Sequence, residues 1–230
     1  MKMANHNHIL KEIERIQGFL IEKGYASKAK FLTAKQIARD SYDIEIDLGD
    51  KLFLSEANDC LSYEDLYFFY LEKEVYTCQF IDGALLQIEY SIRNGELWSY
   101  RLGFFPHPRL AAQEFCPEFY DSEDLFFVDI LNKPVIHPVL RFDFDNNPEN
   151  FKPCVHSRSH LTIGQLDSCR ITLNRPLTPF SFLHFILKNF YSTLFGKISK
   201  DFFEKCKHHQ LSFDECIEAE EKFELHMVFQ

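Results

Sequence analysis

The chain has little glycine and no glycine-rich segment. Only eight of its 230 residues are glycine, and none belongs to the clustered loop that holds phosphates in many nucleotide-binding folds. No stretch reaches about 18 uninterrupted apolar residues, so we expect no membrane span. The first residues lack the apolar region of a signal peptide. Repeats, low-complexity tracts and flexible linkers are also missing, which favours a single domain.

The cysteines do not follow the spacing of a disulfide framework or of a structural zinc site. There are seven, an odd number at irregular spacing and without a C-x-x-C pair, which favours reduced thiols in the cytoplasm. Cys206, His208, His209 and Cys216 are residue types that bind zinc, but they lack the paired spacing of a structural zinc site. A polar helix end explains them more simply, and the sequence indicates no cofactor.

Charge is unevenly distributed along the chain. The net charge of −10 argues against a general nucleic-acid coat. Residues 1–40, however, hold eight Lys or Arg residues against four acidic ones. A basic end on an acidic body can contact an anionic partner, although it is more often a solvated surface.

Two helices are predicted over residues 1–40. In 8–23, four isoleucine or leucine residues follow a helical spacing, and Gly24 is a natural stop. Ser27 can cap a second helix that runs to about Ala38. The pair would form a helical hairpin, for which a DNA-reading helix-turn-helix is the alternative.

Strand patterns dominate from Tyr42 onward, interrupted by a helix over 63–72 that Ser62 can cap. The dipeptides Asp82-Gly83 and Asn94-Gly95 divide residues 75–105 into three strands, because type I′ turns need positive φ. We therefore predict a three-stranded antiparallel meander.

The second half of the chain continues the sheet and then returns to helix. Strands are predicted over 136–144, 155–163 and 168–173, and Thr178-Pro179 begins an apolar helix that runs to 195. The last residues, 223–229, alternate as a strand, and short helices are predicted over 125–131 and 199–209. The predicted fold is a single α+β domain: a twisted antiparallel sheet, mostly from residues 42–173, with the N-terminal hairpin and the helices of 178–230 packed on it.

A polar constellation lies on one face of the later strands. Strand alternation and pairing would bring basic, imidazole and carboxylate side chains together. Arginine supplies forked donors to phosphate or carboxylate, and histidine can move a proton near neutral pH. The candidate catalytic residues are His156, His160 and Asp143, and the candidate ligand-binding residues are His137, Arg141, Arg158, Thr162 and Arg170.

Other interpretations of these residues stay open. The same face would also suit the solvent side of a half-covered sheet, with Arg–Asp pairs fixing the register. His160-Leu-Thr162 matches one His-x-Thr element of the two-histidine phosphodiesterases, but a second element is missing. Asp143-Phe-Asp145 near two histidines could hold a divalent metal as in a nuclease, but no Glu-x-Lys follows.

The stretch from 156 to 191 carries a resemblance to a known family. The segments His-Leu-Thr-Ile-Gly-Gln, Cys-Arg-Ile, Pro-Leu-Thr-Pro and Phe-Ile-Leu-Lys-Asn-Phe-Tyr are similar to a bacterial family defined only as a domain of unknown function. The family pattern has a proline after Cys-Arg-Ile, where this chain has Thr172. The resemblance implies a bacterial cytoplasmic protein and a component of a mobile-element or phage-defence gene cluster, but it transfers no activity.

Two functions follow as hypotheses. The first is an interaction or regulatory subunit whose His/Arg sheet face binds an anionic ligand, with a protein partner or homo-oligomer. The second is a phosphodiesterase or nuclease that uses His156, His160 and Asp143 with an arginine phosphate clamp. Nucleic acid would bind through the basic N-terminal helices or the Arg/His face. Whether the chain is an enzyme stays open.

Overall fold

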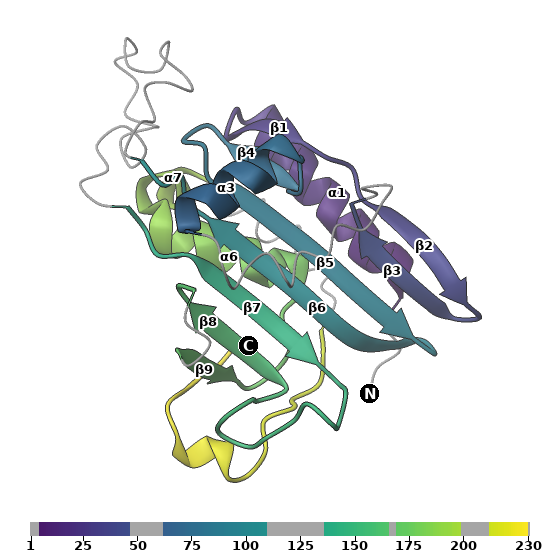
Figure 1. The fold of residues 1–230 in the computed structure, drawn as a ribbon. Coiled ribbons are helices and arrows are strands. Elements are labelled where there is room, and N and C mark those ends of the chain that lie inside the picture. Colours follow the sequence, from purple (N-terminus) through teal and green to yellow (C-terminus); the bar gives the residue numbers. More distant parts are fainter. Residues whose placement is uncertain (1–4, 47–61, 110–135, 166–168, 199–211, 230) are drawn as a thin grey trace.

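In the described residues, ten strands form one open, mostly antiparallel sheet, so the predicted α+β class is confirmed. The computed structural model describes residues 5–46, 62–109, 136–165, 169–198 and 212–229 (Figure 1). The main path of the sheet runs β1-β4-β5-β6-β7-β8-β9-β10, and β2 and β3 attach to it through β5. Its strands are β1 (Ala26–Ala29), β2 (Thr33–Ala38), β3 (Ser41–Glu45), β4 (Cys78–Phe80), β5 (Leu85–Arg93), β6 (Glu96–Phe105), β7 (Leu140–Asp145), β8 (Ser159–Ile163), β9 (Arg170–Leu173) and β10 (His226–Met227).

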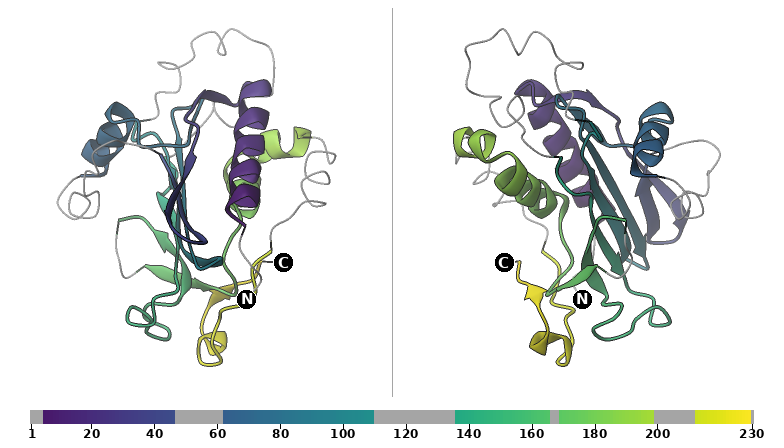
Figure 2. Two further views of the ribbon diagram at one scale, coloured as in Figure 1. Left: turned by 90° about the vertical axis from the view of Figure 1, so that its right-hand side faces the viewer. Right: turned by 60° about the vertical axis from the view of Figure 1, so that its left-hand side comes forward.

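Helices cover the two faces of the sheet unequally. α1 (His6–Glu22), α6 (Pro179–Phe190) and α7 (Ser192–Lys197) lie on one face, and α3 (Tyr63–Glu72) lies on the other (Figure 2). The apolar stripes of α1 and α6 are fully buried against the sheet. α3 packs over Leu85 and Phe105 in a smaller apolar cluster. The α3 face is therefore covered at one end, and the rest of it is polar.

The meander forms as its turns predict. β4, β5 and β6 are consecutive antiparallel neighbours. Asn94 and Gly95 both have positive φ, at 53° and 78°, as a type I′ turn requires. Ser62 and Thr178 cap α3 and α6 through their side chains, as expected. Each of these signals acts within a few residues of the chain, so the tertiary structure contains the turns and caps that the sequence predicts.

The predicted second N-terminal helix is wrong. Residues 26–38 form β1 and β2 instead, and β2 pairs with β3 through a tight turn in which Asp40 has φ +54°. Alanine, lysine and glutamine in β2 favour helix, but this short edge strand gains a backbone partner on the sheet. The helical hairpin is therefore corrected to a helix followed by a β-hairpin, and the helix-turn-helix alternative loses its second helix.

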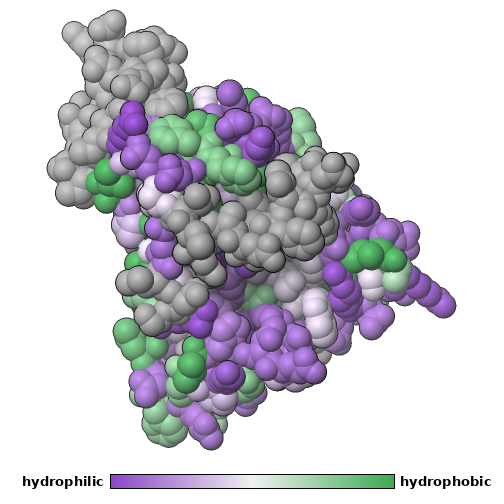
Figure 3. Space-filling model, viewed as in Figure 1, coloured by the Kyte–Doolittle hydropathy of each residue, from purple (hydrophilic) through white to green (hydrophobic). Residues whose placement is uncertain are grey.

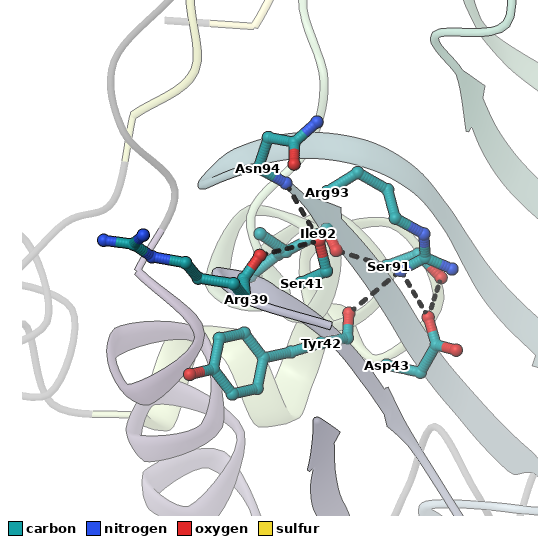
Figure 4. Close-up of polar contacts among 8 residues, drawn as sticks. All are labelled: Arg39, Ser41, Tyr42, Asp43, Ser91, Ile92, Arg93 and Asn94. Atoms are coloured by element: carbon teal, nitrogen blue, oxygen red, sulfur yellow. Dashed lines mark hydrogen bonds and ion pairs between the residues drawn. The ribbon is translucent and has the colours of Figure 1, made fainter. Parts of the chain in front are cut away.

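Contacts between two hairpin turns hold the β2–β3 hairpin in place (Figure 4). Asn94 donates its backbone N–H to the Ser41 hydroxyl at 3.1 Å. Asp43 accepts hydrogen bonds from the Ser91 hydroxyl at 2.7 Å and from the Arg93 guanidinium at 2.8 Å. These contacts join β3 to β5, which are far apart in the sequence. Local propensities alone could therefore not predict this pairing.

Several predicted boundaries shift. β7 and β8 begin at residues 140 and 159, later than predicted, and the last strand contains only His226 and Met227. α6 ends at Phe190, because Tyr191 leaves helical geometry and donates its hydroxyl to buried Asp82 at 2.9 Å. The helices predicted over 125–131 and 199–209 lie outside the described residues. Among the helices in the described ranges, none combines the length and apolar character needed to cross a membrane.

Candidate functional site

Two rows of polar residues cross the face of the sheet opposite α1 and α6. In the first row, Arg101, Asp143 and His160 lie directly opposite one another on β6, β7 and β8. The second row lies two residues further along each strand. It consists of Gly103 on β6, Arg141 on β7, Thr162 on β8 and Arg170 on β9. Directly paired residues point to the same face of a sheet. The register therefore brings together residues that lie up to 69 positions apart in the chain.

Alternation explains why this face is polar while the other is apolar. Between the polar residues stand Tyr100, Leu102, Phe142 and Leu161, all buried in the core with α1 and α6. A period of two along each strand sends every second side chain to the opposite face. The same residues that build the core thus fix the direction of the arginines and histidines.

Asp143 is the centre of a charge cluster. Its carboxylate accepts hydrogen bonds from Arg101 Nε at 3.2 Å and from Arg141 Nε at 2.6 Å. Burial acts to raise the pKa of Asp143, but the two arginines outweigh it and hold that pKa below its usual value. Asp143 is therefore an anion that positions two guanidinium groups.

The two histidines lie beside this cluster. The His160 ring is buried, and its Nδ1 lies 2.9 Å from the Ser157 carbonyl oxygen. A carbonyl only accepts hydrogen bonds, so Nδ1 carries the proton and Nε2 faces Asp143 Oδ2 at 4.0 Å. Burial lowers the pKa of His160, which keeps the ring neutral. His156 packs edge-on against His160 with ring centroids 5.0 Å apart.

A cleft of about 570 Å³ opens over these residues. In the space-filling view of this face, hydrophilic side chains gather over the ends of β6 and β7 away from α3 (Figure 3). Five of the eight predicted site residues line the cleft, namely Arg141, Asp143, His156, His160 and Arg170. Its volume lies within the range of small-molecule sites.

The other three predicted residues lie elsewhere. His137 precedes β7 and contacts Phe190 of α6, with ring centroids 5.1 Å apart. Arg158 precedes β8, donates to Asn146 Oδ1 at 2.8 Å and lines a separate pocket of about 230 Å³. Thr162 keeps the predicted register but is buried between the two arginines of its row. The prediction that His137 and Arg158 share the polar face is wrong, because β7 and β8 begin only after these two residues and strand alternation does not apply to them.

Sequence reasoning missed several residues of the cleft. Arg101 and Glu89 lie on strands of the meander and face the cleft beside Asp143. Burial raises the pKa of Glu89. Trp98, the only tryptophan of the chain, also lines the cleft. Alternation within β6 would have put Ser99, Arg101 and Gly103 on one face, but the pairing of β6 with β7 was not readable from spacing.

A metal site finds no support in the described ranges. No group of three His, Cys, Asp or Glu side chains there is arranged to hold a metal ion. Asp145, proposed with Asp143 as a metal ligand, instead accepts from the backbone N–H of Asn147 at 2.8 Å and from the side chain of Asn150 at 2.7 Å. Cys206, His208 and His209 lie outside the described residues.

Fold and cleft together define the class of protein: an α+β protein whose open, mostly antiparallel sheet carries a polar, ligand-sized cleft on the face opposite its main helices. A family model described as "Uncharacterized conserved protein (DUF2290)" matches residues 27–229. The chain belongs to this family, which confirms the resemblance to a domain of unknown function. Comparison with curated proteins and with solved structures found no match.

Proposed function

We propose that the chain is an interaction or regulatory subunit that binds an anionic group, either phosphate or carboxylate, in the polar cleft. The observation that carries this proposal is the cluster in which Arg101 and Arg141 share Asp143 while Arg170 lines the same cleft. Two guanidinium groups thus share one carboxylate, and a third arginine, from another strand, lines the same cleft. Guanidinium groups suit the planar, two-point recognition of phosphate and carboxylate oxygens.

Arg101 supplies the donors for such a ligand. Its Nε donates to Asp143, and its side chain is 40% exposed. Arg101 also lines the cleft, where Glu89 is its second charged neighbour. Asp143 holds the guanidinium in one orientation, so little side-chain entropy is lost when an anion binds.

Binding of inorganic phosphate, measured calorimetrically at low ionic strength, tests the proposal. Arg101→Gln should weaken binding about tenfold, the loss of about 1.4 kcal/mol expected for one charge-assisted contact. Arg158→Gln is the matched control, because it removes the same charge from the separate pocket. Equal weakening by both variants would show that only net charge matters, and absence of phosphate and carboxylate binding in the wild type would end the proposal.

The anionic group can be carried by a partner chain as well as by a small ligand. Recovery of a complex from the host, followed by native mass spectrometry with wild type and Arg101→Gln, separates these cases. A partner held through the cleft should be lost from the variant. Participation in a phage-defence or mobile-element cluster stays a prediction of the family resemblance.

Phosphodiester cleavage is a second candidate function, favoured by the state of His160. A neutral ring with Nδ1 donating to Ser157 presents the lone pair of Nε2, which can accept a proton from an attacking hydroxyl. His156 would be the second acid/base group, while Asp143 positions the arginines. His160→Gln should then abolish cleavage and leave phosphate binding intact, as assayed on an RNA, DNA and cyclic nucleotide panel. Uncleaved wild-type substrates would exclude this candidate.

A further inference from the structure

Trp98 enters the cleft through an irregularity in β6. Ser99 pairs with Ser91 and Leu97 pairs with Ile92, so Trp98 is an additional residue with no partner on β5. Such β-bulges redirect side chains and occur often beside functional sites. Trp98 is 37% exposed and lines the cleft. The bulge therefore leaves the largest aromatic side chain of the chain available to a ligand.

Amide groups surround this aromatic end of the cleft. Asn146 donates its backbone N–H to the Trp98 carbonyl oxygen at 2.9 Å. The loop that follows is tied to Asp145 through the backbone of Asn147 and the side chain of Asn150, and both asparagines line the cleft. The Asn150 nitrogen is held by Asp145 and the Asn147 oxygen accepts the backbone N–H of Glu149 at 3.1 Å, so the loop fixes the direction of an amide donor on Asn147 and an amide acceptor on Asn150. The aromatic end can thus hydrogen-bond the edge of a flat heterocycle as well as contact its face.

The aromatic and cationic ends are separated along the strands. Trp98 and Arg101 are three residues apart on β6, or about 10 Å at the rise of a β-strand. On β7, Asp145 and Arg141 are four residues apart, or about 13 Å. A ligand that uses both ends must carry a flat ring and an anionic group joined by a spacer.

We propose that the ligand of the cleft is a nucleotide, with its base stacked on Trp98 and its phosphate bound by Arg101 and Arg141. This inference rests on the proposed anion site and names the ligand class. In a nucleotide, the sugar provides the spacer between the base and the phosphate. Every base has a π-face that stacks on aromatic side chains, and the asparagine amides would favour one base over another.

A single nucleotide fits this cleft better than a polynucleotide. The volume of about 570 Å³ is that of a small-molecule site. The net charge of −10 would repel a long polyanion, whereas a single phosphate needs only the arginine end of a cleft that carboxylates also line. A contact between Trp98 and a partner chain is the competing role for this side chain.

Because Trp98 is the only tryptophan, its fluorescence reports on the cleft alone. The full chain is titrated with the four nucleoside 5′-monophosphates, with the matching nucleosides and with ribose 5-phosphate, and affinities are also measured by calorimetry. We expect at least one monophosphate to quench the fluorescence saturably and to bind about tenfold more tightly than ribose 5-phosphate, as base stacking requires. Trp98→Ala should remove that advantage and Trp98→Phe should retain part of it. Arg39→Gln, which removes an exposed charge from the turn between β2 and β3, should leave it unchanged.

The outcomes separate this inference from the proposed function. If ribose 5-phosphate binds as tightly as every monophosphate and depends on Arg101, the anion site stands and the nucleotide inference falls. If nucleosides bind as tightly as their monophosphates, the phosphate is not recognised and the nucleotide inference also falls. If no phosphate compound binds, phosphate recognition and the nucleotide inference both fail.

Discussion

Glu12 should make the stability of the protein depend on pH. This residue of α1 reaches the start of α6, where its Oε1 accepts the backbone N–H of Phe180 at 3.0 Å. Its Oε2 is buried, and the Thr178 hydroxyl also lies close to the carboxyl group. Burial raises the pKa of Glu12 from 4.5 to about 7, in spite of the hydrogen bond from Phe180.

The sign and size of the effect follow from that pKa. Because the folded state holds the Glu12 proton more tightly than the unfolded state, the free energy of unfolding falls as pH rises from about 4.5 to about 7. A shift of about 2.5 pH units corresponds to about 3 kcal/mol. Above pH 7, the folded protein carries the full cost of an ionised, buried carboxylate.

Glu12→Gln removes the charge and keeps an acceptor for the Phe180 N–H. We expect the variant to be about 3 kcal/mol more stable than wild type at pH 8, with a melting temperature about 5–10 °C higher, and nearly equal to wild type at pH 4.5. Chemical denaturation at both pH values measures the difference directly. Glu14→Gln, on the exposed side of the same helix, is the control and should change stability little at either pH. A stability gain from Glu12→Gln that is the same at pH 4.5 and pH 8 would refute the reasoning.

Two further predictions concern the sheet itself. Asp143→Asn should lower the free energy of unfolding by about 2 kcal/mol, because two guanidinium groups lose their shared carboxylate. It should nevertheless tighten phosphate binding in calorimetry, because the loss of a negative charge beside the anion outweighs the loss of the orientation that Asp143 gives to Arg101; weaker binding would show that the orientation matters more. Gly103→Ala should destabilise the protein by about 1–3 kcal/mol in thermal unfolding, because a Cβ there would overlap the buried Phe105 ring; an unchanged melting temperature would mean that the ring moves freely.

The sequence predicted correctly the elements that are decided by residues close together in the chain, such as α1 and the turn between β5 and β6. Ile9, Ile13, Ile16 and Leu20 marked the buried stripe of α1, and all four are buried. The Asn94-Gly95 turn closed as expected. Each of these features is decided by spacing or by backbone preference within a few residues, which is why one sequence suffices to read them.

The candidate site was only partly predictable. Asp143 and His160 were correctly placed side by side, because both stand in regular strands with clear alternation. Arg101 was missed, since its position beside Asp143 depends on the pairing of β6 with β7. Arg158 was assigned to the wrong pocket because the chain before β8 is irregular.

The sequence by itself thus determined the α+β class, the caps of α3 and α6, the hairpin turns of the meander and the two-faced character of the strands, all of which follow from short-range chemistry. Only the tertiary structure decided that residues 26–38 are strands and that Arg101, Asp143 and His160 form one row across the sheet. Partners in a sheet are chosen by hydrogen bonds and packing between distant segments, and a shift of one residue would turn every side chain to the opposite face. The cleft therefore depends on strand order and register, which are properties of the folded chain as a whole.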